Sequence, residues 1–202
     1  NSGERQSGGA FRDRNSMLGD IINSQPVYAG LPNVSLYKDD ASYASFVQAQ
    51  SSRTPVVYVG GNDGMLHAFD AGTGSTKGNE LFAFMPTAAM SVLTHNDPGN
   101  NKYPNWSPDY DHAYSVDGEL TVADVKISGA WKTVLVGSMG RGGKSVFALD
   151  VTNPSSPVLL WEKTSSDIGN VLGKPIIAKS AAGWKVYFGN GPNSANGGSK
   201  DR

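Results

Sequence analysis

The sequence contains no cysteine among its 202 residues. That absence excludes disulfide bonds, a thiol nucleophile, and zinc or iron–sulfur sites built on cysteine. The chain also has no large excess of positive or negative charge, because 17 Lys and Arg are balanced by 18 Asp and Glu. Nucleic-acid-binding surfaces are basic, so we expect no nucleic-acid partner. No hydrophobic run approaches the roughly 18 residues that a membrane-spanning helix needs, so we expect no membrane span.

Residues 1–16 are polar and rich in Gly and Ser, which is typical of a flexible linker. They contain neither an initiator Met nor the apolar region and cleavage site of a signal peptide. We therefore expect the chain to begin inside a longer precursor, with order starting near Met17.

One pattern occurs three times: an apolar run, a Gly-rich turn and a second short run. Two copies, at 54–70 and 131–150, are complete, and a third begins at Gly183 and runs into a polar tail. The 25 Gly and 11 Pro suit many short strands joined by tight turns. Self-similar units of this kind are typical of β-propellers. We predict an all-β fold, a partial (truncated) β-propeller whose first blades occupy residues 17–191, followed by a flexible tail at 192–202.

Local patterns predict the individual elements. Apolar residues near helical spacing predict a short inserted helix at 39–50 and a helical turn at 88–93. Runs of β-branched and aromatic residues bounded by Gly, Asn, Asp and Pro predict strands elsewhere. We expect strands or strand pairs at 56–59 with 65–70, 80–86, 113–117 with 119–125, 131–136 with 145–150, 158–161, and 175–179 with 184–188.

The turn of the second copy contains Gly143-Lys144-Ser145, which is similar to the end of a phosphate-binding loop. The first glycine of that motif belongs five positions before Gly143, where this sequence has Ser138. A phosphate loop also opens a helix, whereas Val146–Asp150 is short and strand-like. We interpret the segment as a hairpin turn and not as a nucleotide site.

Candidate catalytic and metal-binding groups are scattered. Asn62-Asp63-Gly64 and Asn96–Asn101 carry oxygen ligands, but neither has the spacing of a calcium loop. Asn-Asp-Gly between strands is turn chemistry. We place His67 on a strand, facing solvent or a neighbouring blade, and expect His112 to pair with the adjacent Asp111. With no Gly-x-Ser-x-Gly elbow either, we expect no catalytic, cofactor-binding or metal-binding residue and predict that the chain is not an enzyme.

The long polar loop from His95 to Tyr110 is the best candidate for partner contact. Loops of this length are uncommon in compact domains and often functional. Aromatic residues among Asn, Pro and Gly are typical of adaptable contact loops. The candidate contact residues are Asn100, Tyr103, Trp106 and Tyr110. We expect the tryptophans that begin or end strands to pack between blades; these are Trp131, Trp161 and Trp184.

Five segments, in order, resemble the C-terminal propeller of PilY/PilC-type proteins: 19–28, 57–70, 112–125, 131–150 and 183–191. That family comprises bacterial type IV pilus biogenesis and adhesion factors, and its propeller looks like a modified quinoprotein-type one. The resemblance implies an exported protein at the cell surface, the pilus tip or the outer membrane. It implies binding to minor pilins or the pilus tip, and to a host-cell or surface receptor.

The resemblance also implies a calcium site in the full-length propeller, on an Asp/Asn-rich loop that we expect downstream of the third copy. No segment of this sequence matches that loop, so we assign no calcium ligand here. The alternative is a fragment of a pyrroloquinoline-quinone-dependent dehydrogenase propeller. Those enzymes often carry adjacent cysteines and a Trp-rich docking repeat, and this sequence has neither. Because a shared fold does not imply a shared function, we favour the non-catalytic pilus protein.

Overall fold

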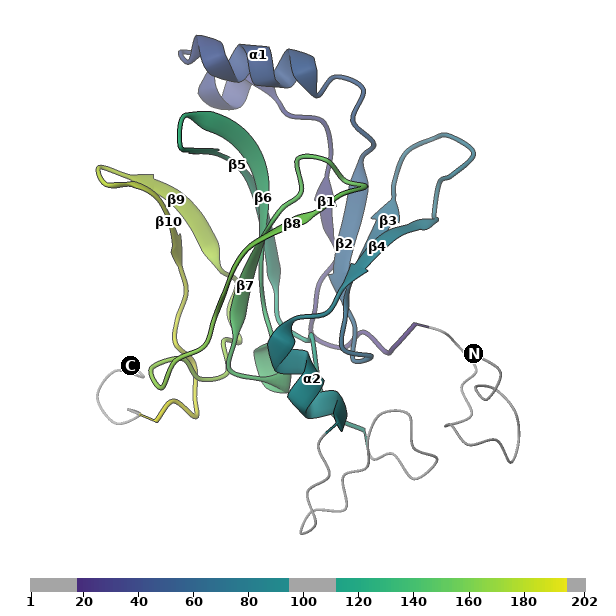
Figure 1. Cartoon of the computed structure of the whole chain (residues 1–202), viewed down its shortest axis with the longest axis vertical. Coiled ribbons are helices and arrows are strands. Elements are labelled where there is room, and N and C mark those ends of the chain that lie inside the picture. Colours follow the sequence, from purple (N-terminus) through teal and green to yellow (C-terminus); the bar gives the residue numbers. More distant parts are fainter. Residues whose placement is uncertain (1–17, 95–111, 196–202) are drawn as a thin grey trace.

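The computed structural model describes residues 18–94 and 112–195, which fold mainly into antiparallel sheets (Figure 1). Blade 1 comprises β1 (Val27–Ala29), β2 (Val56–Gly60), β3 (Leu66–Asp70) and β4 (Glu80–Phe84), in that spatial order. Blade 2 comprises β5 (Leu120–Ile127), β6 (Ala130–Ser138), β7 (Val146–Asp150) and β8 (Val158–Lys163). A hairpin follows, formed by β9 (Ile176–Ser180) and β10 (Gly183–Tyr187).

Helices join or decorate these sheets. They are the 3-10 helices η1 (Val34–Tyr37) and η2 (Gly140–Gly142) and the α-helices α1 (Ala41–Ala49) and α2 (Thr87–Thr94). In Figure 1 blade 2 lies between blade 1 and the β9–β10 hairpin. Successive four-stranded meanders side by side are the arrangement expected of a partial propeller.

Most predicted elements are confirmed. The runs at 56–59 and 65–70 form the antiparallel pair β2–β3, and those at 131–136 and 145–150 form β6–β7. The strands predicted at 80–86 and 158–161 correspond to β4 and β8, and 175–179 with 184–188 to β9–β10. The inserted helix is α1, capped by Asp40, whose carboxylate accepts a hydrogen bond from the Ser42 N–H at 2.9 Å. The helical turn at 88–93 lies within α2.

One predicted strand pair is wrong. The segment 113–117 is irregular, and β5 begins only at Leu120 and pairs with β6. The segment instead lies between the two blades, where the Val116 N–H donates to the Gly61 carbonyl of blade 1 at 3.3 Å. The Asp117 N–H donates to the Met139 carbonyl of blade 2 at 3.3 Å. Its backbone groups therefore find partners on both sides without forming a strand.

Blade 2 is buried on both faces. Towards blade 1, buried side chains such as Tyr58, Leu66 and Phe147 form one core, and the rings of Phe84 and Phe147 lie 5.5 Å apart. Towards the hairpin, a second core contains Val136 and Ala148. All five residues of β7 are buried, because this strand contributes to both cores. Sheets covered on both faces are what a propeller requires of its interior blades.

The prediction for the tryptophans is confirmed for Trp161 and Trp184, which pack in the core between blade 2 and the hairpin. Trp131 also contacts the neighbouring hairpin, because its ring lies 6.2 Å from that of Trp184 on β10. It packs in addition against α1 and η1. Its ring is 4.6 Å from that of Tyr43 and 4.7 Å from that of Tyr37, and its indole N–H donates to Ser42 Oγ at 3.0 Å.

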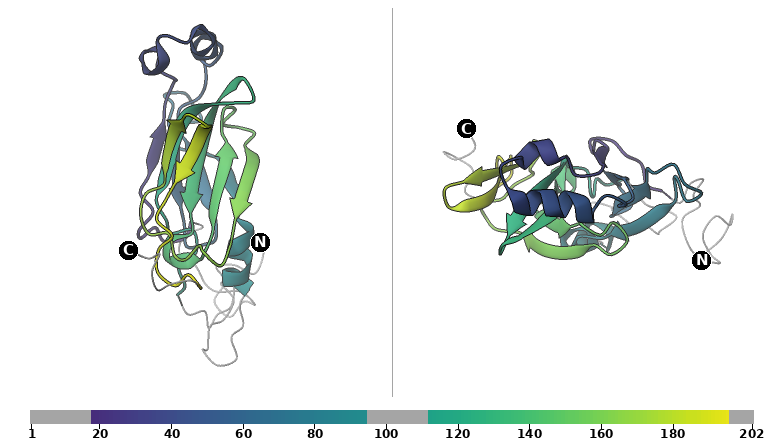
Figure 2. Two further views of the ribbon diagram at one scale, coloured as in Figure 1. Left: turned by 90° about the vertical axis from the view of Figure 1, so that its left-hand side faces the viewer. Right: turned by 90° about the horizontal axis from the view of Figure 1, so that it is seen from above.

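That insertion, residues 30–55, leaves blade 1 between β1 and β2 and docks on blade 2. Seen from above, α1 lies across the ends of the sheets (Figure 2). The Tyr43 hydroxyl donates to Asp124 Oδ2 at 2.7 Å, and Thr133 Oγ1 donates to Asp124 Oδ1 at 2.6 Å. Arg53 donates to Thr133 Oγ1 at 2.6 Å and also to the Gly30 carbonyl. The insertion thus ties the two blades together through a buried polar cluster.

Candidate functional site: the polar rim beside residues 95–111

The predicted contact residues Asn100, Tyr103, Trp106 and Tyr110 lie outside the described residues. So do Asn96–Asn101, His95 and Asp111. The structure does describe the two points where this stretch leaves and rejoins the blades, namely the end of α2 and His112. The partner-contact role predicted for this stretch therefore stays a prediction. The structure instead describes the candidate site on the blade residues next to it.

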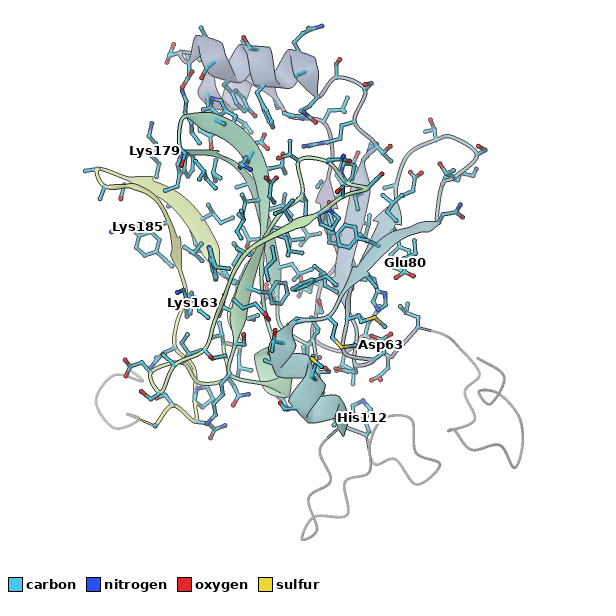
Figure 3. All side chains as sticks on the ribbon, in the orientation of Figure 1. Asp63, Glu80, His112, Lys163, Lys179 and Lys185 are labelled. Carbon is cyan, nitrogen blue, oxygen red and sulfur yellow. The ribbon has the colours of Figure 1, made fainter. Side chains whose placement is uncertain are left out.

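This surface consists of polar side chains from five segments. We call it the polar rim, and it comprises Asp20, Asn62, Asp63, His67, Glu80 and His112. Figure 3 shows Asp63 and His112 at the lower end of blade 1, with Glu80 above them. The lead-in to β1, the β2–β3 turn, strands β3 and β4, and the segment that follows residue 111 each contribute.

His67 lies at the centre of the rim and is only 3% exposed. Its Nε2 lies 3.1 Å from each oxygen of Asp63, and its Nδ1 lies 2.6 Å from Glu80 Oε1. Asp63 also accepts a hydrogen bond from the Gly19 N–H at 2.7 Å. The alternative of a solvent-facing His67 is therefore wrong, whereas the alternative that it faces a neighbouring blade stays a prediction. Within blade 1 the imidazole links the β2–β3 turn and β4, and through Asp63 also the lead-in.

The protonation states follow from these contacts. Burial alone would lower the pKa of His67, but hydrogen bonds and charges from Asp63 and Glu80 outweigh it and raise that pKa. Burial alone would raise the pKa of Asp63, but hydrogen bonds from His67 and from the Gly19 and Met65 N–H groups lower it. Both shifts favour the charged forms, the imidazolium of His67 and the carboxylate of Asp63.

This pair makes stability depend on pH in a defined direction. The His67 contribution is complete below its ordinary pKa of 6.5 and is lost as the pH rises through the raised value. The Asp63 contribution is complete above 3.8 and is lost as the pH falls through the lowered value. The unfolding free energy measured by denaturant titration should therefore fall as the pH rises above 6.5 and through the raised pKa of His67, and His67→Gln should remove most of that fall.

His112→Gln is the matched control, because its side chain is 44% exposed. The part of the fall that depends on His67 should persist in this variant. A fall of the same size in the His67→Gln protein would show that other groups set the pH dependence.

The rest of the rim joins blade 1 to the segment that follows residue 111. Asn62 Oδ1 accepts from the Ser115 N–H at 2.9 Å, and its amide donates to Asp20 Oδ2 at 3.2 Å. His112 Nε2 lies 2.8 Å from the same Asp20 oxygen. Burial alone would raise the pKa of Asp20, but hydrogen bonds from His112 and Asn62 lower it. His112 thus has a partner 92 positions away.

The contacts of the polar rim are structural ones. The Asn62-Asp63-Gly64 turn behaves as predicted, with Gly64 at a φ of 98°. In residues 18–94 and 112–195, no group of three or more His, Cys, Asp or Glu side chains could hold a metal ion. Gly143-Lys144-Ser145 leads directly into β7, so its interpretation as a hairpin turn and not a phosphate loop is confirmed. The rim carboxylates and imidazoles bind one another and the backbone.

Sequence reasoning missed Asp20 and Glu80 as rim residues. A weak signal was present, because Gly19-Asp20 before blade 1 is similar to Gly169-Asn170 before the hairpin. The structure places both pairs in equivalent positions: the Gly169 N–H donates to the Asn190 carbonyl at 2.7 Å, as the Gly19 N–H donates to Asp63. Nothing comparable in the sequence marks Glu80, which lies 13 positions from His67.

Comparison with known proteins decides the family. The sequence model described as the PilY1 beta-propeller domain matches residues 18–202. The chain belongs to the PilY1 beta-propeller family. A type IV pilus biogenesis factor PilY1 homolog of Xylella fastidiosa is 52% identical over 196 residues, which cover 92% of this chain and 15% of the relative. The type IV pilus biogenesis factor PilY1 of Pseudomonas aeruginosa PAO1 is 45% identical over 195 residues, covering 92% and 16%.

A solved structure supports the same assignment. The crystal structure of the Pseudomonas aeruginosa PilY1 C-terminal domain superposes with a TM-score of 0.63 at 40% identity, and covers 85% of this chain and 32% of that one. The chain thus spans 15% and 16% of the length of these two PilY1 relatives. The resemblance and the partial propeller predicted from sequence are confirmed. These relatives are named as pilus factors, which gives no support to the dehydrogenase alternative.

In the described part of the chain, no helix is long and apolar enough to span a membrane.

Proposed function

We propose that this chain is part of a type IV pilus biogenesis factor that binds partners through propeller loops and does not catalyse a reaction. The observation that carries the proposal is the PilY1 family match over residues 18–202. The rim chemistry supports it, because the rim histidines and carboxylates are engaged in structural contacts. Propeller folds serve many functions, so the family match weighs more than the fold.

Partners and location follow as further parts of the proposal. Minor pilins or the pilus tip are the proposed assembly partners, and a host-cell or surface receptor is the proposed adhesion partner. The protein would then be exported to the cell surface, the pilus tip or the outer membrane. Calcium is proposed for the full-length propeller, outside residues 18–94 and 112–195, which offer no metal cluster.

We further propose that Asn100, Tyr103, Trp106 and Tyr110 contact a partner. Both described flanks of that stretch are attached to the blades. At the start of α2, the Thr87 N–H and hydroxyl donate to the Glu162 carboxylate of blade 2 at 2.8 and 2.6 Å. On the other side, His112 lies 2.8 Å from Asp20 of the lead-in. Aromatic anchors on a stretch fixed at both ends lose little entropy on binding.

The test uses bacteria that lack the gene and are complemented with the full-length protein carrying Trp106→Ala. Loss of a central aromatic contact weakens binding by about tenfold or more, so surface pili should become scarce at an unchanged protein level. Lys77→Ala, at an exposed position between β3 and β4, is the control and should restore normal piliation.

The outcomes separate the two parts of the proposal. Normal piliation in the deletion strain would overturn the pilus function. A deletion strain without pili that regains normal piliation with the Trp106→Ala protein would overturn the contact role of residue 106 alone.

A further inference from the structure

The surroundings of His67 suit only one protonation state of its imidazole ring. Nδ1 lies 2.6 Å from Glu80 Oε1, and Nε2 lies 3.1 Å from each oxygen of Asp63, so both ring nitrogens face a carboxylate. The imidazolium carries an N–H on each nitrogen and donates to both partners, whereas the neutral ring has one N–H and one lone pair. Loss of the proton therefore turns a lone pair towards a carboxylate oxygen, and one of the two contacts must break.

Asp63 and Glu80 are the charged groups that face this ring within residues 18–94 and 112–195. They come from the β2–β3 turn and from β4, respectively. The residues that pair with His67 across the sheet are apolar, namely Val59 of β2 and Ala83 of β4. The two carboxylates therefore decide what happens when the ring changes its charge.

The two carboxylates differ in how firmly they are held. The Asp63 side chain is 3% exposed and also accepts from the Gly19 N–H at 2.7 Å and the Met65 N–H at 3.3 Å. The Glu80 side chain is 44% exposed, and in the described part of the chain its one hydrogen-bond partner is His67. Water solvates a released Glu80 carboxylate, whereas a released Asp63 carboxylate would stay buried. Glu80 is therefore the partner that the neutral ring gives up.

The His67–Glu80 contact lies where the pairing of β4 is irregular. Glu80 is the first residue of β4, and the β3–β4 register shifts between Ala68 and Phe69. Because of this shift Phe69 pairs with Glu80, whereas Ala68 pairs with Phe82. A bulge of this kind disrupts the backbone ladder locally. β4 is also the outer strand of blade 1 in the described sheet, so the contact with His67 adds a side-chain link at a weak point.

We propose that the His67–Glu80 contact is a pH-dependent switch, which holds the start of β4 on β3 while His67 is protonated and releases it when the proton is lost. The lead-in stays attached in both states, because Asp63 keeps its backbone donors and the remaining N–H of His67. Acidic surroundings tighten this edge of blade 1, and alkaline surroundings loosen it.

The pH range of the switch follows from the same contacts. Burial alone would lower the pKa of His67, but hydrogen bonds and charges from Asp63 and Glu80 raise that pKa above its ordinary value of 6.5. The His67–Glu80 contact is therefore intact below pH 6.5 and is lost as the pH rises through the raised value.

Hydrogen exchange read by mass spectrometry in the full-length protein tests the switch. Rates are corrected for the intrinsic pH dependence of exchange. The amides of residues 81–84 should then exchange about threefold to tenfold faster above the raised pKa of His67 than below pH 6.5, and those of β2 should not change. Exchange in β4 that does not depend on pH would overturn the proposal. A pH step at residues 18–20 in place of β4 would overturn it equally.

Two variants at Glu80 distinguish a switch from a contact that is the same at every pH. The amide of Glu80→Gln accepts from a protonated Nδ1 and donates to an unprotonated one, so β4 should stay protected on both sides of the step. In Glu80→Ala the amides of residues 81–84 should exchange at the faster rate at every pH. A pH step of unchanged size in the Glu80→Gln protein would overturn the proposal.

His112→Gln is the matched control, because His112 is the other histidine of the polar rim and contacts Asp20. The pH step at residues 81–84 should persist in this variant. Its disappearance would assign the step to His112 and would overturn the role proposed for His67.

Discussion

Replacement of Gly142 by alanine should destabilise the folded protein by about 3 kcal/mol. A Cβ atom at this position would lie 1.9 Å from the Ser115 carbonyl oxygen and 2.4 Å from its Cα. These are backbone atoms of the segment between the blades, and that segment cannot move easily because Val116 is fully buried and its N–H is bonded to Gly61. The added methyl group would therefore force the two blades apart.

Denaturant unfolding followed by tryptophan fluorescence measures this loss. Gly173→Ala is the matched control, since a Cβ atom added at that position would meet no atom within 4 Å. That variant should change the unfolding free energy by less than about 0.5 kcal/mol. Equal stability of the two variants would mean that the segment is not packed between the blades as described.

Replacement of Asp124 by alanine should cost about 3 kcal/mol, because it leaves buried partners without their acceptor. Asp124 is 8% exposed and accepts from Tyr43 and Thr133, and Thr133 in turn accepts from Arg53. Burial, with a smaller effect of Asp124, raises the pKa of Tyr43, so its hydroxyl stays protonated and needs an acceptor. Burial also lowers the pKa of Arg53, which marks the guanidinium as partly desolvated.

One further variant separates the lost acceptor from the lost charge, and a second serves as the control. Asp124→Asn keeps an oxygen acceptor and should cost about 1 kcal/mol. Asp39→Ala, at an exposed position beside α1, should leave unfolding almost unchanged. A loss for Asp124→Ala no larger than that for Asp39→Ala would contradict the role of this cluster in joining the insertion to blade 2.

Much of the fold could be predicted from the sequence, because it depends on local periodicity. The two complete repeat copies predicted the pairs β2–β3 and β6–β7, since apolar strands flanking Gly-rich turns pair with their neighbours in sequence. The inserted helix was predictable for the same reason, because apolar residues recur at helical spacing within α1.

The features of the structure that could not be predicted from the sequence depend on contacts between residues that are distant in the sequence. The segment 113–117 has an alternating pattern, but the sequence could not show that its backbone bonds lie with Gly61 and Met139. His112 pairs with Asp20, 92 positions away. Tyr43 and Asp124 are 81 positions apart, so the surface on which the insertion docks could not be predicted from the sequence.

The polar rim connects this architecture to the proposed function. Its ion pairs fix the β2–β3 turn and the lead-in, and they also fix His112, where the chain rejoins the blades after residue 111. A rigid surface of this kind would position the proposed contact residues between 95 and 111.

Site-specific photo-crosslinking in living, piliated bacteria tests the central claim most directly. A photoreactive phenylalanine analogue would replace Trp106 in the full-length protein, and the same group at Lys77 would serve as the control. We expect a covalent adduct with a pilus subunit from position 106 and none from position 77. No adduct at position 106, or the same adducts from both positions, would contradict it.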